Sequence, residues 1–359
     1  FHYVNTIFTF SYNENKKESS RILIMEKSLG EVFKSAGKTT KANFVALLCA
    51  TLAFFAICYL PAMITTLIAD SSNYMAYASV TMASVGWVYA ALFFVAPLYM
   101  GFLAAVMHNY DQTGQKVVFK EAWLEALKSY GRYLLTMLVI MLFALVLVVV
   151  LTIVMMIVML PMIMSYAMNI SAGIAEYTQK MASGILITIL PLMIVIAIVA
   201  YLFGLSAAFA EFIPQTEKKS GFKAYFSSFA YLFKGRFWRN LGHMLLIDVI
   251  TVGIVIVAEL LVMIPLIKTI VNGIINGQMM IDAQYFASAM VVPMLIIGIA
   301  AAFLQVFVMP YRFEVYKNAK LAYEQNKSQK LTNHEPIVQD DLPAQDEKQS
   351  TIADDKAEQ

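Results

Sequence analysis

The sequence predicts an all-α fold: a polytopic membrane helical bundle of six transmembrane helices, arranged as three hairpins with amphipathic interfacial elbow helices. Three observations lead to this class. Hydrophobic residues make up 60% of the chain and charged residues only 14%, whereas about a quarter of an average soluble protein is charged. Six apolar runs each exceed the roughly 20 residues that cross a bilayer. The lysines and arginines are also concentrated in alternate connections.

The six apolar runs lie near residues 43–69, 78–107, 134–165, 183–210, 241–271 and 288–311. Lipid offers the backbone no hydrogen-bond partner, so each run must satisfy its own N–H and C=O groups and should be a helix. Together with their connections, the runs predict a single transmembrane domain over residues 26–317.

The two ends of the chain differ from this domain in composition. Residues 1–25 lack the continuous apolar core of a signal peptide, and Met25 opens a segment that resembles a natural start. We therefore expect an N-terminal extension that is either non-native or disordered. Residues 318–359 are acidic and contain few apolar side chains. They should form a disordered cytoplasmic tail, because they cannot bury enough apolar surface to fold.

Basic residues predict how the domain is oriented. Of the 26 lysines and arginines, all but Lys180 and Lys268 lie in the two terminal segments and in the second and fourth connections between runs. Cytoplasmic loops of membrane proteins carry the excess of Lys and Arg. The pattern therefore predicts a multi-pass protein of the bacterial inner (plasma) membrane, with both its N-terminus and its C-terminus in the cytoplasm.

An amphipathic segment precedes each hairpin. Apolar residues recur at helical spacing in all three segments: Leu29, Phe33, Ala36 and Thr40; Phe119, Trp123, Ala126 and Tyr130; Phe222, Phe226, Phe229 and Phe233. Such stripes are typical of helices in the headgroup layer, with rings in the acyl chains and basic groups at phosphates. Alternatively, the segments pack on one another as a cytoplasmic collar. The predicted interfacial lipid contacts are Trp123, Lys120, Lys128, Arg132, Phe226, Phe233, Lys234, Arg236, Trp238 and Arg239.

Short matches between the last two hairpins indicate an internal repeat. Gly101 and Ala105 match Gly204 and Ala208 in register with the elbow stripes, and a Gly-x-x-x-Ala motif allows two membrane helices to approach closely. Gly-Arg-aromatic triplets at 131–133 and 235–237 also correspond, with a slip of one residue.

This layout, with stretches such as Gly235-Arg236-Phe237-Trp238-Arg239-Asn240-Leu241, resembles a broad group of poorly characterised bacterial six-helix membrane proteins. The group includes the membrane domain attached to some glycerophosphodiester phosphodiesterases. The resemblance covers about residues 26–325. In the fused proteins the catalytic barrel is a separate segment, whereas this sequence ends in a short polar tail. The resemblance therefore implies no hydrolase activity here.

The sequence holds no recognisable catalytic constellation. There is no Gly-x-x-x-x-Gly-Lys phosphate loop, and four histidines with two separated cysteines give no metal-binding pattern. We therefore expect a protein that is not an enzyme, with no metal and no cofactor.

Two carboxylates inside the fifth run are the candidate polar site. Asp248 and Glu259 are eleven residues apart, almost three helical turns, so they share one helix face about 16 Å apart. A charged carboxylate at the bilayer centre is costly, so Glu259 should be protonated, paired or facing water. One hypothesis is an ion or proton path inside the bundle, with Glu259 as the central carrier and Asp248 as the inner one.

The alternative is structural. A neutral Glu259 would be hydrogen-bonded to a Ser, Thr, Tyr or backbone group of a neighbouring helix, and Asp248 would meet His243, Arg239 or an elbow lysine. Glu211, Arg312 and Glu314, at the ends of spans, would be anchors or ion pairs.

The leading functional prediction is a non-enzymatic integral membrane protein that engages membrane lipids or a membrane-protein partner. The alternative is a secondary transporter or proton-coupled permease that uses Glu259 inside the bundle. A net charge of +2 gives no reason to expect nucleic-acid binding, and the sequence leaves the oligomeric state open.

Overall fold

The computed structural model describes residues 8–9, 22–23, 27–68, 74–169, 174–275 and 283–334. Within these residues the elements are β1 (Phe8–Thr9), β2 (Ile22–Leu23), α1 (Leu29–Ile68), α2 (Tyr74–Thr113), α3 (Phe119–Asn169), α4 (Ile174–Ala210), α5 (Ile213–Thr216), α6 (Gly221–Lys234), α7 (Phe237–Ile275) and α8 (Ala283–His334). The short strands β1 and β2 pair antiparallel. Most of the predicted N-terminal extension lies outside the described residues.

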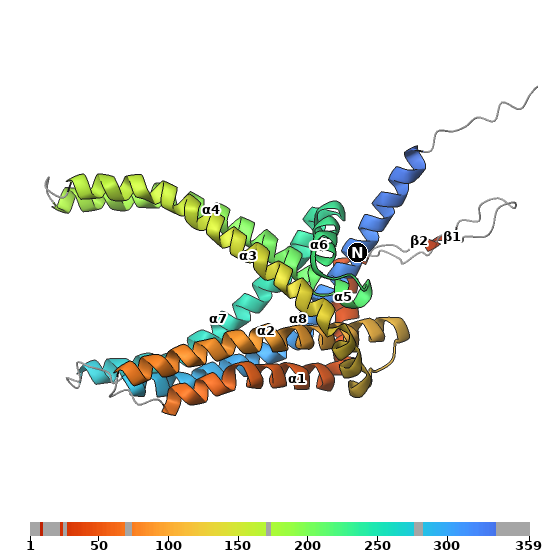
Figure 1. Cartoon of the computed structure of the whole chain (residues 1–359), viewed down its shortest axis with the longest axis horizontal. Helices are drawn as coiled ribbons and strands as arrows, with labels where there is room; N and C mark the ends of the chain where they lie inside the picture. Colours follow the sequence, from red (N-terminus) through yellow and green to blue (C-terminus); the bar gives the residue numbers. More distant parts are fainter. Residues whose placement is uncertain are drawn as a thin grey trace, which may run out of the picture.

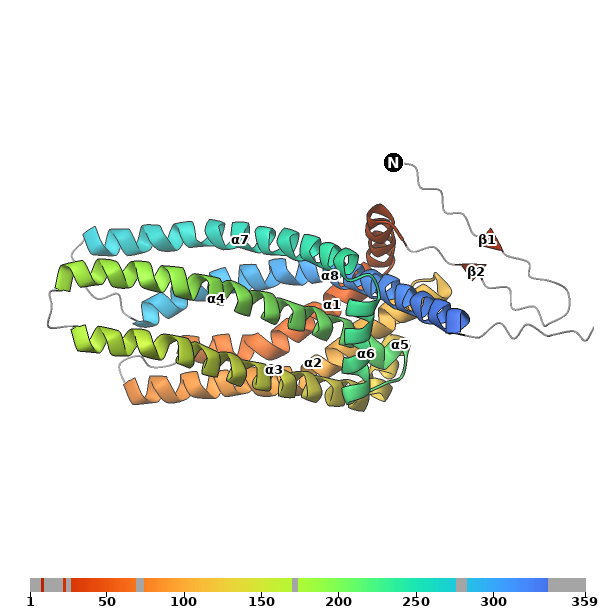
Figure 2. The same cartoon turned by 90° about the horizontal axis from the view of Figure 1, so that it is seen from above.

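The all-α class and the six spans are confirmed. Helices α1, α2, α3, α4, α7 and α8 are each long and apolar enough to cross a membrane, and each holds one of the six predicted runs. Seen from above, the six long helices extend in roughly the same direction from the end that carries α5 and α6 (Figure 2).

One end of the bundle carries α5, α6 and the first turns of α1 and α3, and we call it the basic end (Figure 1). From the basic end the α3–α4 hairpin leans away from α1, α2 and α8, so that the two groups diverge toward the opposite end (Figure 1). In the most apolar part of α3 only 6% of the residues are buried within the protein. An apolar surface of this size needs lipid as its solvent.

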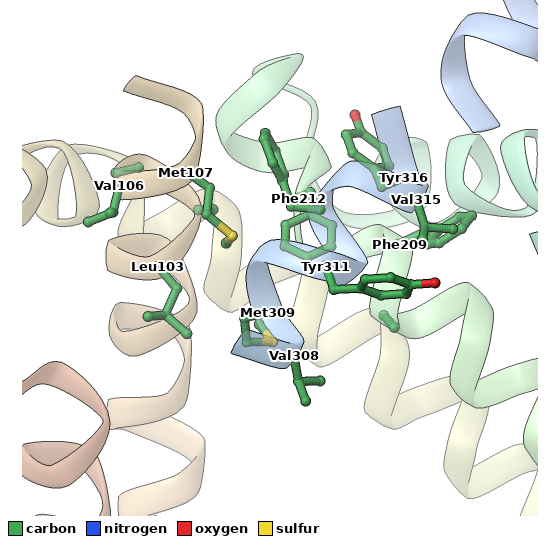
Figure 3. Close-up of a cluster of buried hydrophobic side chains, with 14 of the residues drawn as sticks. Leu103, Val106, Met107, Phe209, Phe212, Val308, Met309, Tyr311, Val315 and Tyr316 are labelled. Atoms are coloured by element: carbon green, nitrogen blue, oxygen red, sulfur yellow. The ribbon is translucent and has the colours of Figure 1, made fainter. Parts of the chain in front are cut away.

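The core therefore lies near the basic end, where the three hairpins converge. Leu103 and Met107 of α2, Phe209 and Phe212 at the end of α4, and Tyr311 and Tyr316 of α8 meet there (Figure 3). All six side chains are almost completely buried.

The three amphipathic segments adopt three different forms. The third is a separate helix, α6, which ends at Lys234 and is followed by Gly235 and then by Arg236 in the left-handed region at φ +61°. The first belongs to α1, but non-helical backbone angles at Asn43 kink the helix between the segment and the span. The second is continuous with its span in α3, so the prediction of a separate elbow helix there is wrong.

The kink in α1 is held by the side chain of Asn43. Its Nδ2 donates to the carbonyl of Thr39 at 3.2 Å, and its Oδ1 accepts the backbone N–H of Val117 at 2.9 Å. The start of α3 has no comparable break, because residues 119–132 continue as one helix directly into the apolar run.

The predicted boundary of the disordered tail at residue 318 is also wrong. Helix α8 continues to His334, because its first polar turns pack at the basic end. Asn318 and Ala319 are buried, and Asn318 donates from Nδ2 to the carbonyl of Lys27 at 3.2 Å. The rest of the predicted tail, residues 335–359, lies outside the described residues.

Candidate functional site: a half-open cavity beside an ion pair

An ion pair links α7 and α8 near the basic end. The guanidinium Nη2 of Arg312 donates to Oδ1 of Asp248 at 2.7 Å, and the hydroxyl of Tyr201 from α4 donates to Oδ2 at 3.0 Å. Each carboxylate oxygen of Asp248 thus accepts one hydrogen bond. About three quarters or more of the Arg312 and Asp248 side chains is buried. The three residues join three helices where α4 still lies close to α7.

A cavity of about 280 Å³ adjoins this ion pair. Helices α1, α2 and α8 supply its walls, and Glu211, just beyond the end of α4, closes it at the basic end. The polar lining residues are Thr51, Tyr59, Tyr99, Glu211, Gln305 and Arg312, and the apolar ones include Phe54, Phe55, Met100 and Met309. The cavity is half open. The α3–α4 hairpin leans away from the three helices that line it, toward the end opposite the basic end (Figure 1).

The cavity holds both of its charged side chains at one end and is lined by uncharged residues along the rest, apolar ones together with the polar Thr51, Tyr59, Tyr99 and Gln305. Gly298 and Arg312 both line it from α8, and 14 residues of helix span about 21 Å. Arg312 and Glu211 mark the polar end, and Gly298 and Phe55 mark the far end. The shape and the order of its lining match an elongated amphiphile better than a compact polar solute.

The walls of the cavity are fixed by aromatic packing and one hydrogen bond. Phe54 stacks on Tyr99 with ring centroids 4.3 Å apart, and the Tyr99 hydroxyl lies 3.1 Å from Oγ1 of Thr51. At the far end Phe55 lies against Gly298, and a side chain at that position would overlap its ring. The glycine lets α1 and α8 approach closely.

The polar end holds two buried atoms without hydrogen-bond partners among the described residues. Oε2 of Glu211 and Nε of Arg312 are buried, and neither finds a partner among the residues that the structure describes. Buried polar atoms are almost always hydrogen-bonded, so such an atom beside a cavity suggests a ligand or water site. Within the described residues no ion pair joins Glu211 to Arg312, whose Nη2 is held by Asp248.

Within the part of the chain that the structure describes, Asp248 is the one of the two predicted path residues that lies in a polar cluster. Its partners are Arg312 and Tyr201, not the predicted His243, Arg239 or elbow lysine. The side chain of Glu259 is exposed, so the prediction that it lies inside the bundle is wrong. The two residues do share a helix face, but α4 and α7 diverge with distance from the basic end (Figure 1).

The predicted lipid contacts lie on the outer surface to different degrees. The exposed ones are Lys120, Trp123, Lys128, Phe226, Phe233, Lys234, Arg236 and Trp238, and Arg132 and Arg239 are partly buried. Trp238 is the most accessible large apolar side chain of this set, with 80% of its surface exposed. In α6 the phenylalanines Phe222 and Phe226 face outward, while Ala224, Tyr225 and Ser228 form the buried face. The elbow thus packs on the bundle and also presents aromatic rings outward.

A second polar cluster ties the elbow α6 to α8. Glu217 accepts hydrogen bonds from the hydroxyls of Tyr231 at 2.8 Å and Tyr316 at 2.9 Å. Lys219 lies 2.7 Å and Lys320 3.3 Å from its oxygens. Burial alone would raise the pKa of Glu217, but these donors and charges outweigh it and hold the pKa below its ordinary value. Burial, and then the nearby Glu217 carboxylate, raise the pKa of the Tyr231 phenol.

The two glycine motifs of the predicted repeat differ in the structure. Gly101 packs closely on α3: a Cβ there would lie 3.4 Å from the ring of Tyr133 and 3.5 Å from Cα of Ala126. A Cβ at Gly204 would meet nothing within 4 Å among the described residues. The first motif therefore lies at a close contact between two helices, and the second does not meet another helix closely among the described residues.

The sequence predicts that Glu211 and Arg312 are anchors or ion pairs at span ends. Arg312 is an ion-pair partner, as predicted. The cavity that both residues line was missed, because its other walls come from α1 and α2, far away in sequence. A usable signal was that two opposite charges lie at the ends of two apolar runs that enter the same side of the membrane.

No family model, no curated protein and no solved structure matches this chain. The resemblance to bacterial six-helix membrane proteins therefore stays a prediction. The class that the fold and the cavity define is a multi-pass helical membrane protein with a half-open, amphipathic internal cavity.

Proposed function

We propose that this chain is a non-enzymatic integral protein of the bacterial cytoplasmic membrane that binds a membrane lipid or another amphiphile. The observation that carries the proposal is the cavity between α1, α2 and α8, with the charged Glu211 and Arg312 at one end and uncharged, mainly aromatic and aliphatic side chains along the rest. In the proposed orientation the basic end faces the cytoplasm, so the polar end of the cavity lies toward the cytoplasmic leaflet.

Transport through Glu259 has less support. The Glu259 carboxylate is exposed rather than enclosed. A carrier at this position would therefore lack an enclosing shell of described protein groups to select a proton or an ion. Lipid engagement instead uses the features that the bundle builds at its convergence point.

Photo-crosslinking tests the proposal. The full chain is placed in vesicles of phosphatidylethanolamine and phosphatidylglycerol that contain a lipid with a diazirine in its acyl chain. The labelled peptides are then mapped by mass spectrometry. We expect labelling at Phe54 and Phe55 of α1 and at Met309 of α8. Ala301→Leu, which fills the cavity from α8, should remove this labelling.

Two controls make the result decisive. The exposed surface of α3 around Leu145 and Val148 meets bulk lipid, so its labelling should be equal in both proteins. Ala300→Leu, one residue away and not part of the lining, should leave the α1 labelling intact. The proposal is overturned if Ala301→Leu labels the α1 peptide as strongly as the wild type does.

A further inference from the structure

The polar end of the cavity has more negative than positive charge. Three ionisable groups lie there, the carboxylates of Glu211 and Asp248 and the guanidinium of Arg312. The remaining polar lining groups, Thr51, Tyr59, Tyr99 and Gln305, are neutral. With all three groups ionised, one negative charge would have no counter-charge of its own among the described lining residues.

Arg312 cannot supply that counter-charge without leaving Asp248. Its Nη2 lies 2.7 Å from Asp248, and Asp248 is held in place by a second hydrogen bond, from Tyr201. Oε2 of Glu211 remains buried and accepts no hydrogen bond from any described residue. A buried carboxyl group without a partner either takes up a proton or pairs with a cationic donor, and the ammonium group of a ligand in the cavity would be such a donor.

The rest of the cavity lining indicates which other chemical group the cationic ligand must contain. Phe54, Phe55 and Met309 line the route from Glu211 toward Gly298, and the polar groups beside them, Thr51, Tyr59, Tyr99 and Gln305, carry no charge. The route therefore offers no second charge to hold a hydrated ion. An alkyl chain fits it, and aromatic faces near the entrance also favour a cation. The ligand must therefore combine an ammonium group with an apolar chain.

We infer that the cavity selects amphiphiles with a cationic amine headgroup, which binds Glu211 while the chain lies along α8 toward Gly298. This inference rests on the proposed function and narrows it to one class of ligand. The same chemistry is found in the headgroup of an aminophospholipid and in a free single-chain amine.

Binding of soluble probes tests the charge selection. The full-length protein in a neutral maltoside detergent is titrated with n-dodecylammonium and with dodecyl sulfate, and binding is followed by native mass spectrometry. Wild type should bind the ammonium probe in preference to the sulfate. Glu211→Gln should weaken ammonium binding by about tenfold or more, since a charge-assisted hydrogen bond is lost.

Glu259→Gln is the matched control, because it removes an exposed carboxylate from the same bundle and changes the net charge by the same amount. It should leave ammonium binding unchanged, which separates the cavity from general attraction to the micelle. An unchanged thermal unfolding midpoint shows that each variant is folded. If Glu211→Gln unfolds, the preference of the wild type for ammonium over sulfate, and its loss in Ala301→Leu, decide the question.

The source of the amine is distinguished by competition. If n-dodecylammonium displaces a photoreactive phosphatidylethanolamine from the α1 peptide, the site takes the lipid headgroup; if it binds without displacing that lipid, the ligand is a free amine. Equal binding of both probes, abolished by Ala301→Leu, would overturn the amine selectivity and leave amphiphile binding standing. Binding that Ala301→Leu does not affect would overturn both.

Discussion

Arg312 has two roles at the residue scale, because it pairs with Asp248 on one side and lines the cavity on the other. A guanidinium suits this position, since its several N–H donors point in different directions. One donor group holds the α7–α8 contact, while Nε has no partner among the described residues. The ion pair thus fixes the geometry of the site and leaves part of the hydrogen-bonding capacity of the Arg312 guanidinium unused.

Asp248→Asn is expected to destabilise the protein by about 1–3 kcal/mol, because Arg312 and Tyr201 lose a charged acceptor in a mostly buried place. Thermal unfolding of the detergent-solubilised protein measures the effect. Glu259→Gln on the same helix face should change stability by no more than about 0.5 kcal/mol, since its side chain is exposed. Equal losses in the two variants would contradict a structural role for the Asp248 ion pair.

Glu217 predicts a dependence of stability on pH. Its pKa in the folded protein lies below the ordinary value of 4.5. The stability that the carboxylate contributes is therefore fully present above that value and is lost as the pH falls through the lower, folded pKa. Glu217→Gln should unfold at a lower temperature than the wild type at pH 7, and the gap should close in acid. A gap that is unchanged at low pH would mean that the carboxylate charge does not hold α6.

At the scale of elements, the third amphipathic segment shows why similar sequences give different helices. Gly235 lies so close to the backbone carbonyls of Tyr231 and Ala319 that a Cβ there would overlap both oxygen atoms. The chain turns at this point to pass α8, and Asn240 donates to the carbonyl of Gly235 to close the turn. Gly131 matches it in sequence, but a Cβ at Gly131 would meet no described atom within 4 Å, so α3 continues straight through.

These two glycines form a matched pair for mutation. Gly235→Ala should destabilise the protein by about 1–3 kcal/mol through overlap with α8. Gly131→Ala should leave stability unchanged or raise it by up to about 1 kcal/mol, since alanine is the better helix former. Unfolding midpoints of the two variants against wild type give the comparison. A loss of stability on Gly131→Ala would show that α3, too, needs a break at this position.

At the scale of the whole molecule, the bundle is packed at its basic end and open toward the other. Aromatic contacts such as Phe33 with Tyr311 and Phe212 with Tyr316 connect α1, the end of α4 and α8 there. Lys27 adds an ion pair to Glu314 at 2.6 Å. The helices α3 and α4 leave this region together and diverge from α1, α2 and α8 toward the opposite end (Figure 1).

The proposed orientation can be tested with single cysteines. Cys49 and Cys58 are first replaced by alanine, and Gln112→Cys at the basic end or Met75→Cys at the start of α2 is then introduced; both sites are exposed. In intact bacteria, a membrane-impermeant maleimide should label Met75→Cys, and it should label Gln112→Cys only after the membrane is opened. The reverse pattern would place both termini outside the cytoplasm.

The carboxylates Asp248 and Glu259 show how far the sequence reaches into the site. Helical periodicity correctly placed both on one face of α7, because that relation depends only on residues close in sequence. Which of the two meets a partner depends on α4 and α8, whose distance from α7 changes along its length. The same holds for Gly131 and Gly235, since only the proximity of α8 makes the second one necessary.

The amino-acid composition is enough to show that lipid is the solvent around the spans, and this assigns the class of the protein. Six apolar runs need lipid, and the backbone in lipid must be helical, so the number and type of spans follow from composition and local hydrogen bonding. Where the hairpins converge, where they diverge and which side chains enclose the cavity depend on contacts between helices that are distant in sequence. In lipid, apolar side chains gain little from burial against one another, so apolar composition does not encode which helices touch. That choice rests on particular contacts, such as Gly298 with Phe55 and Arg312 with Asp248, between residues distant in sequence.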